Sequence, residues 1–317
     1  MDTKTIIENI KVGDTIALSK AITLSESTLD SEQQIAQDIL SSVSKEAVSS
    51  IRIGVTGVPG VGKSTFINSF GRMLTAKGKK IAVLAIDPTS EKSHGSILGD
   101  KSRMNDLVTD KNAFIRPSPS SGTLGGVADK TRESILFCEA AGFDVILIET
   151  VGVGQNETSV SNLVDFFLLL MLSDAGDELQ GIKRGIMEMA DIILINKADG
   201  DNIQRSKNAM LQYKSALHLF PKNVNGWKAK VTTCSGLEEI GLEEIWKTIE
   251  KHNSQIKENN FFTKNRKEQN IYWLHNQIKK ELGNKNYSQL QTTGRLKKLE
   301  EELLHKKATI YHLLKDL

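Results

Sequence analysis

GVTGVPGVGKSTF, residues 54–66, directly follows the short apolar stretch IRI. Within it Gly57, Gly62, Lys63 and Ser64 satisfy the pattern G-x-x-x-x-G-K-[ST] of a phosphate-binding loop. We expect a strand before the loop and a helix after it, so that the backbone N–H groups of the turn point at phosphate oxygens. Lys63 would then reach the β- and γ-phosphates, and the Ser64 hydroxyl would ligate Mg²⁺. The stretch predicts a nucleotide-binding protein without naming the base.

Short apolar runs alternate with helix-like stretches on both sides of this loop. The strand-like runs are IRIGV, KIAVLAI, AFIRP, DVILIE, DFFLLLML, DIILIN and AKVTTC. Continuously apolar strands that are separated by helices are typical of a mostly parallel sheet covered on both faces. Together with the loop they predict an α/β fold of the P-loop NTPase class.

The motif NKAD indicates which base is bound. Asn196, Lys197 and Asp199 come directly after an apolar strand and match N-K-x-D. The Asp199 carboxylate can accept two hydrogen bonds from guanine N1–H and the 2-amino group, whereas adenine lacks that arrangement of donors. GTP is therefore favoured over ATP. The stretch TCSG follows the next strand, and we expect backbone N–H groups there to reach guanine O6, from Cys234, Ser235 and Gly236.

Three carboxylates are candidates for holding Mg²⁺. Asp87 ends the second strand and Glu149 the fourth, while Asp100 lies in a loop rich in small residues. Strand-end carboxylates beside a phosphate loop suit a hard cation that prefers oxygen ligands. No Gln directly follows Gly152, and the nearest is Gln155. Since the attacking water is not obviously positioned, we expect slow intrinsic hydrolysis.

Composition excludes several other classes. The 317 residues include 39% hydrophobic and 25% charged residues, with a net charge of +2 and interspersed signs. This favours a soluble globular protein without a nucleic-acid or membrane surface. The two cysteines, Cys138 and Cys234, have no metal or redox spacing, and the start of the chain lacks a signal-type apolar run. We therefore expect a cytoplasmic protein.

The pattern divides the chain into three regions. We expect an N-terminal helical arm over 1–48, a GTPase domain over 49–252 and amphipathic C-terminal helices over 253–317. The C-terminal helices carry large apolar residues, including Trp273 and Leu274, which a lone helical hairpin would not easily bury. We expect this region to form or brace a homodimer interface, the alternative being that it covers the GTPase core of its own chain.

Several longer blocks go beyond a general nucleotide-binding pattern. These are GVTGVPGVGKSTF, AIDPTSEKSHGSILGDKSRM, FIRPSPSSGTLGGVA, ILIETVGVGQNE, GDELQGIKRGIMEMAD and NKADGD, in this order. The chain thereby resembles the MeaB/ArgK family, the GTPase chaperones of methylmalonyl-CoA mutase, strongly over about residues 13–246. The resemblance implies a P-loop fold of the SIMIBI type, a homodimer, and an adenosylcobalamin-dependent acyl-CoA mutase as partner.

The resemblance also implies roles for individual residues. It implies GTP or GDP and Mg²⁺ as ligands, with Asp87, Asp100 and Glu149 as metal and switch residues. A second switch falls at 151–157, and a third falls within 174–184 and includes Asp177 and Lys183. The nucleotide-binding loop implied by the family consists of Gly57, Val58, Pro59, Gly60, Val61, Gly62, Lys63, Ser64 and Thr65. The catalytic set is Lys63, Glu149, Gln155, Asp177 and Lys183.

Three other functions fit parts of the pattern. A nickel-inserting metallochaperone GTPase would share the loop and sheet but should carry His or Cys groups spaced for metal transfer. An ATP-dependent kinase of a transport system conflicts with a guanine-reading Asp199. A purely structural dimer that merely retains its nucleotide is the third alternative, and GTP turnover measurements distinguish it from a switch. The sequence also leaves open which acyl-CoA mutase would be the partner.

Overall fold

The computed structural model describes residues 2–43, 49–87, 104–119, 124–150, 160–173, 184–218, 220, 223–305, 309–315 and 317. The chain divides into two compact units. One, the sheet unit, comprises residues 49–131 and 143–259, and the other, the helical unit, comprises residues 1–48, 132–142 and 260–317. These two units are defined by the contacts within one chain. The three regions expected from the sequence, an arm, a GTPase domain and a dimerisation region, stay a prediction.

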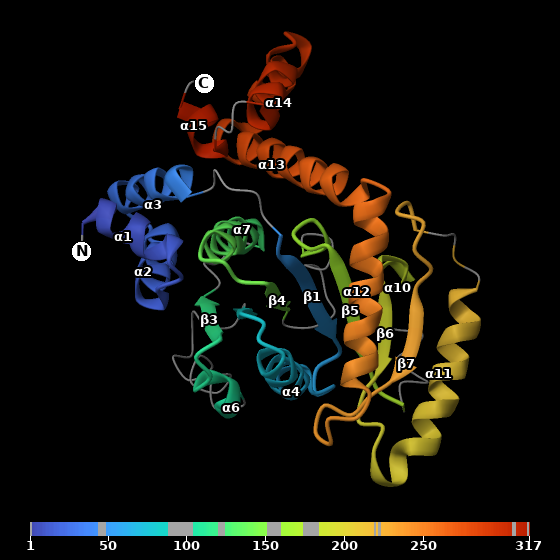
Figure 1. The fold of residues 1–317 in the computed structure, drawn as a ribbon. Coiled ribbons are helices and arrows are strands. Elements are labelled where there is room, and N and C mark those ends of the chain that lie inside the picture. Colours follow the sequence, from blue (N-terminus) through green and yellow to red (C-terminus); the bar gives the residue numbers. More distant parts are fainter. Residues whose placement is uncertain are drawn as a thin grey trace. The chain divides into compact units, whose positions relative to one another are not determined.

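A seven-stranded, all-parallel sheet forms the centre of the sheet unit (Figure 1). The strand order is β3-β2-β4-β1-β5-β6-β7. The strands are β1 (Ile51–Gly57), β2 (Ile81–Asp87), β3 (Ala113–Pro119), β4 (Val145–Glu149), β5 (Phe166–Met171), β6 (Ile192–Ile195) and β7 (Lys230–Thr233). Each of the seven apolar runs in the sequence contributes one strand. The predicted α/β class and parallel sheet are therefore confirmed.

Helices connect these strands in both directions from β1. They are α4 (Lys63–Ala76), α6 (Asn105–Val108), α7 (Leu124–Ala140), α10 (Arg184–Met189), α11 (Ile203–Leu217) and α12 (Leu242–Glu258), with a 3₁₀ turn at Gly200–Asn202. The chain moves from β1 through α4 to β2, but from β5 through α10 to β6 and through α11 to β7. Right-handed crossovers in opposite directions place helices on both faces of the sheet. Both faces are thereby shielded from water, as continuously apolar strands require.

Aspartates at the amino ends of three strands fix the register of the sheet. Asp144, Asp165 and Asp191 directly precede β4, β5 and β6. The backbone N–H of each aspartate donates to the carbonyl oxygen of one residue in, or directly before, a neighbouring strand, and its carboxylate accepts the N–H of that same residue. Arg52 N, for example, donates to Asp165 Oδ2 at 2.9 Å, while Asp165 N donates to Arg52 O at 2.8 Å. The partners of the three aspartates, in order, are Lys80, Arg52 and Phe167.

Asp191 also belongs to a buried polar cluster. His252 Nε2 lies 3.6 Å from Asp191 Oδ1, and its ring makes edge contacts with Phe166 and Trp227 at centroid distances of 5.0 Å. Burial lowers the pKa of His252 to about 4 and raises the pKa of Asp191 to about 7. The imidazole is therefore neutral at pH 7, and the contact is a polar contact within the core rather than an ion pair.

The helical unit contains α1 (Thr3–Lys11), α2 (Thr15–Glu26), α3 (Asp30–Val43), α13 (Phe261–Thr292), α14 (Arg295–His305) and α15 (Ile310–Lys315). Asp14 caps α2, since its Oδ1 accepts a hydrogen bond from Ala17 N at 2.6 Å. Gly283 interrupts α13 with φ 76° and ψ 165°, which only glycine adopts without strain. An ion pair of 2.8 Å between Arg266 and Glu139 joins α13 to the end of α7 within this unit.

The C-terminal apolar residues differ from expectation in one respect. Trp273, Leu274 and Ile278 on α13 are at most 4% exposed within the single chain. Burying Trp273 and Leu274 therefore requires no second subunit, and the argument from their exposure to a homodimer is wrong. A homodimer remains a prediction that rests on the family resemblance. None of the helices in the described ranges is long and apolar enough to cross a membrane.

We expect Asp165→Ala to lower the free energy of unfolding by about 1–3 kcal/mol, because the buried N–H of Arg52 loses its acceptor. Asp165→Asn retains an oxygen acceptor and should lose less. Urea denaturation followed by circular dichroism measures both. An Asp165→Ala variant as stable as the original chain would show that the carboxylate does not hold the register.

Candidate nucleotide-binding site

Those predicted site residues that the structure describes gather at the carboxyl edge of the parallel sheet. The phosphate loop follows β1 in the middle of the sheet, with Asp87 and Glu149 ending β2 and β4 on one side of it. Asn196 and Cys234 follow β6 and β7 on the other side. Topology alone thus separates the carboxylates from the proposed base-reading residues and places the phosphate loop between them.

The loop is shaped by its glycines and anchored by its valines. Gly57 has φ 157°, and a Cβ there would lie 2.5 Å from the carbonyl oxygen of Leu170 on β5, so no larger residue fits. Gly62 has φ 90° and precedes α4 without a capping side chain, which leaves the first N–H groups of the helix to the loop side. Val58 and Val61 are buried at 4% and 0% exposure. The two valines therefore anchor the loop in the core, while Pro59 and Gly60 between them are exposed, which leaves the loop accessible to a phosphate group.

Lys63 and Ser64 begin α4 beside this loop. Lys63 Nζ donates to the carbonyl oxygen of Gly57 at 3.0 Å, so its ammonium lies over the loop. Ser64 Oγ donates to Glu149 Oε1 at 3.0 Å in a buried setting. The positions predicted to contact phosphate and Mg²⁺ are thus adjacent in space.

The Ser64–Glu149 pair fits a hard divalent cation. A hydroxyl and a carboxylate oxygen from different elements converge at one point, and Mg²⁺ prefers such oxygen ligands. Asp87 ends β2, which pairs with β4, but its side chain and all of Asp100 lie outside the described residues. In the part of the chain that is described, no cluster of three or more His, Cys, Asp or Glu side chains is positioned to hold a metal.

Asn196 links the phosphate loop to the loop after β7. Its Nδ2 donates to the carbonyl oxygen of Val61 at 2.8 Å, and its Oδ1 accepts from the N–H of Gly236 at 3.0 Å. The Cys234 thiol lies 3.6 Å from the same oxygen, and burial raises its pKa to about 12, so it remains a protonated weak donor. Asn196 is 2% exposed. One amide group therefore holds the two loops in a fixed relation.

Asp199 is oriented by the neighbouring loop. The hydroxyl of Ser235 donates to Asp199 Oδ2, and Ser235 Oγ in turn accepts the N–H of Glu238 at 3.0 Å. Lys197, between Asn196 and Asp199, has the left-handed φ of 59°, and its carbonyl oxygen accepts Asn202 Nδ2 at 2.8 Å. The carboxylate predicted to recognise guanine is thus held in place before any ligand arrives.

The backbone N–H groups after β7 have other partners than a base. The N–H of Cys234 donates to Ile195 O at 2.9 Å, that of Ser235 to Ile240 O at 3.1 Å, and that of Gly236 to Asn196 Oδ1. The expectation that they reach guanine O6 does not fit this geometry. These hydrogen bonds instead shape the loop after β7, which positions Asp199.

Sequence reasoning missed two buried hydroxyl hydrogen bonds and one glycine contact. Thr150 Oγ1 donates to Thr56 Oγ1 at 2.8 Å, which ties the end of β1 to the residue after Glu149. Ser69 Oγ on α4 donates to the Gly236 carbonyl oxygen at 2.6 Å, and a Cβ at Gly236 would lie 2.9 Å from Phe66 Cα. The available signal for the first contact was a threonine at the carboxyl end of each of two mostly apolar strands, Thr56 in β1 and Thr150 directly after β4. Gln155, Asp177 and Lys183 lie outside the described residues.

A glycine-rich strand-to-helix loop, an adjacent Ser–Glu pair and an Asn-Lys-x-Asp loop define the class of P-loop guanine-nucleotide-binding proteins. The family model described as methylmalonyl Co-A mutase-associated GTPase MeaB matches residues 18–291. The chain therefore belongs to this GTPase family.

Two curated relatives and one solved structure are similar to this chain over most of its length. The chain is 45% identical to the GTPase ArgK of Escherichia coli over 88% of this chain and 84% of that protein. It is also 45% identical to the mitochondrial methylmalonic aciduria type A homolog of Mus musculus, over 84% of this chain and 66% of that protein. The crystal structure of a LAO/AO transport system kinase has a TM-score of 0.78 at 35% identity and covers 99% of this chain and 95% of its own.

We expect GDP to bind at least ~100-fold more tightly than ADP, because Asp199 can accept two charge-assisted hydrogen bonds from guanine worth about 1.5–3 kcal/mol each. Asp199→Ala should remove most of this preference. Ser235→Ala should weaken GDP about 5- to 10-fold, since it only releases the carboxylate. Isothermal titration calorimetry measures all three. Equal affinities for GDP and ADP, or an Asp199→Ala variant with unchanged GDP affinity, would remove the guanine assignment.

Proposed function

We propose that GTP binding and hydrolysis by this chain control the loading and retention of adenosylcobalamin on a partner acyl-CoA mutase, with methylmalonyl-CoA mutase as the first candidate. The observation that carries the proposal is the family model over residues 18–291, whose description names association with that mutase. The nucleotide site supports it, because a GTP-dependent chaperone needs a site that binds guanine nucleotide and Mg²⁺.

In this proposal the residues around the phosphate loop bind and orient GTP. Lys63 would turn from the loop carbonyl oxygens to the β- and γ-phosphates, and the N–H groups of 57–65 would surround them. Ser64 and Glu149, with Asp87 and Asp100, would hold Mg²⁺, which when bound neutralises charge on the phosphates. Asn196, Lys197 and Asp199 would hold the base. The loop of Cys234, Ser235 and Gly236 would support them through its hydrogen bonds to Asn196 and Asp199.

The proposed switch consists of segments that the γ-phosphate orders. Asp87, Asp100 and Glu149 would contact Mg²⁺ or phosphate in the GTP state, and these contacts are lost on hydrolysis. A mutase that binds one nucleotide state more tightly must shift the nucleotide equilibrium in return. If it also orders Gln155, Asp177 or Lys183 near the γ-phosphate, it accelerates hydrolysis.

The remaining finer predictions belong to the same proposal. They are a homodimer in which residues 253–317 take part, a GTPase domain over 49–252 with a helical arm before it, and a cytoplasmic location. Light scattering of the full chain tests the dimer, because a monomer at micromolar concentration would contradict it.

A kinase function is the second candidate, because a solved structure that is 35% identical carries the name of a transport system kinase. The Asp199–Ser235 hydrogen bond favours guanine recognition instead, since it orients a carboxylate toward base donors that adenine does not present. The ADP and GDP affinities discriminate between these functions. A nickel metallochaperone has no comparable supporting observation.

We expect slow GTP turnover by the chain alone and faster turnover with the cognate mutase. Lys63→Ala should abolish nucleotide binding, whereas Lys183→Ala should weaken the acceleration and leave GDP affinity nearly unchanged. Phosphate release is measured with and without mutase, alongside cobalamin transfer into apo-mutase with GTP, GDP or a non-hydrolysable analogue. If the mutase changes neither turnover nor nucleotide affinity, and cofactor loading ignores the nucleotide, the chaperone proposal fails and a GTPase without this role remains.

A further inference from the structure

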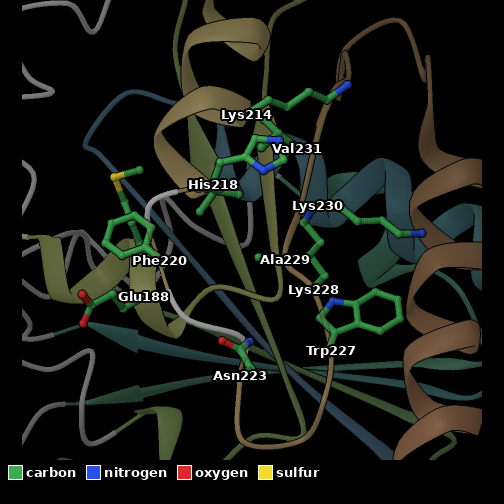
Figure 2. A pocket seen from close by; sticks show the side chains of 12 residues that line it. Glu188, Lys214, His218, Phe220, Asn223, Trp227, Lys228, Ala229, Lys230 and Val231 are labelled. Atoms are coloured by element: carbon green, nitrogen blue, oxygen red, sulfur yellow. The ribbon is translucent and has the colours of Figure 1, made fainter.

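A pocket of about 540 Å³ lies in the sheet unit, at the amino ends of β6 and β7 (Figure 2). Its lining comes from the end of α10, the end of α11 and the segment leading into β7. The nucleotide site lies at the opposite ends of the same two strands, where Asn196 and Cys234 follow them. Four residues of β6 separate the two edges by about 13 Å. The pocket is therefore distinct from the nucleotide site.

Part of the lining is apolar and rigidly held. Trp227, Val231 and Met187 line the pocket and are 3%, 6% and 6% exposed. The indole N–H of Trp227 donates to the backbone oxygen of Asp191 at 3.0 Å, which fixes the ring. Asn223 is likewise held, since its Nδ2 lies 3.4 Å from Asp191 Oδ1. These side chains form a fixed apolar wall of which only a small part is open to the pocket.

The rest of the lining is cationic. Lys214, Lys228 and Lys230 are exposed and line the pocket, together with one exposed acidic residue, Glu188. Figure 2 shows His218 and Lys228 at the central space, with Phe220 and Glu188 across from them. Lys230 Nζ also lies 5.2 Å from the centre of the Trp227 ring, which keeps this cation beside the apolar surface. The pocket thus combines net positive charge with a buried apolar wall.

We propose that this pocket binds a small organic anion, in which a carboxylate or phosphate group meets the lysines and an apolar body lies against Trp227 and Val231. The volume falls in the range of small-molecule sites, which are lined by apolar side chains with a few placed polar groups. The proposal goes beyond the mutase-related function and does not depend on it.

The test uses phenyl phosphate as the probe and full-length protein saturated with GDP, so that the nucleotide site is filled. The chain has three tryptophans, and their indole N–H resonances can be followed by NMR. We expect phenyl phosphate to shift the Trp227 resonance with a Kd of about 1 mM, the affinity that a ligand of this size attains, while Trp246 and Trp273 stay unchanged. Inorganic phosphate has the anionic group without the ring, and benzyl alcohol has the ring without the anionic group. Each should bind about 10-fold more weakly than phenyl phosphate.

Two variants complete the test. The double variant Lys214→Gln, Lys228→Gln should weaken phenyl phosphate about 10-fold and leave GDP affinity unchanged, since each lysine lies outside the nucleotide site. Lys207→Gln removes an exposed charge from the same helix α11 outside the pocket and should leave probe affinity unchanged. The proposal is overturned if the Trp227 resonance does not move up to ~10 mM probe. It is also overturned if the double variant binds like the original chain, or if inorganic phosphate binds as tightly as phenyl phosphate.

Discussion

The amide of Asn196 is the constraint on which the site depends. It joins the carbonyl oxygen of Val61 in the phosphate loop to the N–H of Gly236 in the loop after β7, and it is buried. Ser235, next to Gly236, in turn orients Asp199. Together with the Ser69–Gly236 hydrogen bond, this side chain therefore fixes the loop that is predicted to bind phosphate relative to the loop that is predicted to read the base. Because both of its partners are buried, the amide cannot move without leaving polar groups unsatisfied.

The two edges of the sheet have different tasks. At the amino edge, aspartates before β4, β5 and β6 clamp neighbouring strands through paired hydrogen bonds. These hydrogen bonds fix the register of the strands, so the carboxyl ends of the strands have defined positions relative to one another. The carboxyl edge carries the phosphate loop, the Ser64–Glu149 pair and the Asn196 loop. The proposed anion pocket uses the amino edge of β6 and β7, where the clamp residue Asp191 holds Trp227 and Asn223.

The sequence predicted the strands well because each is a continuous apolar run that a sheet buried on both faces requires. It also singled out Asn196 and Asp199, since their spacing is local, and their role in reading the base stays a prediction. It did not predict that the N–H groups of Cys234 to Gly236 are used inside the protein, because those partners lie on β6, on Ile240 and on Asn196. The burial of Trp273 was missed for the same reason: what covers it is not determined by the pattern of its own helix. Local pattern predicts elements and motif positions, whereas the use of individual polar groups depends on tertiary contacts.

The most direct test of the central role of Asn196 is the affinity of pyrophosphate with Mg²⁺, measured by calorimetry for Asn196→Ala and Asp199→Ala. Pyrophosphate contacts the phosphate loop but has no base. If Asn196 holds the loop in its binding conformation, Asn196→Ala should weaken pyrophosphate at least ~10-fold, while Asp199→Ala should leave it unchanged. An Asn196→Ala variant that binds pyrophosphate as tightly as the original chain would show that the phosphate loop keeps its shape without this amide.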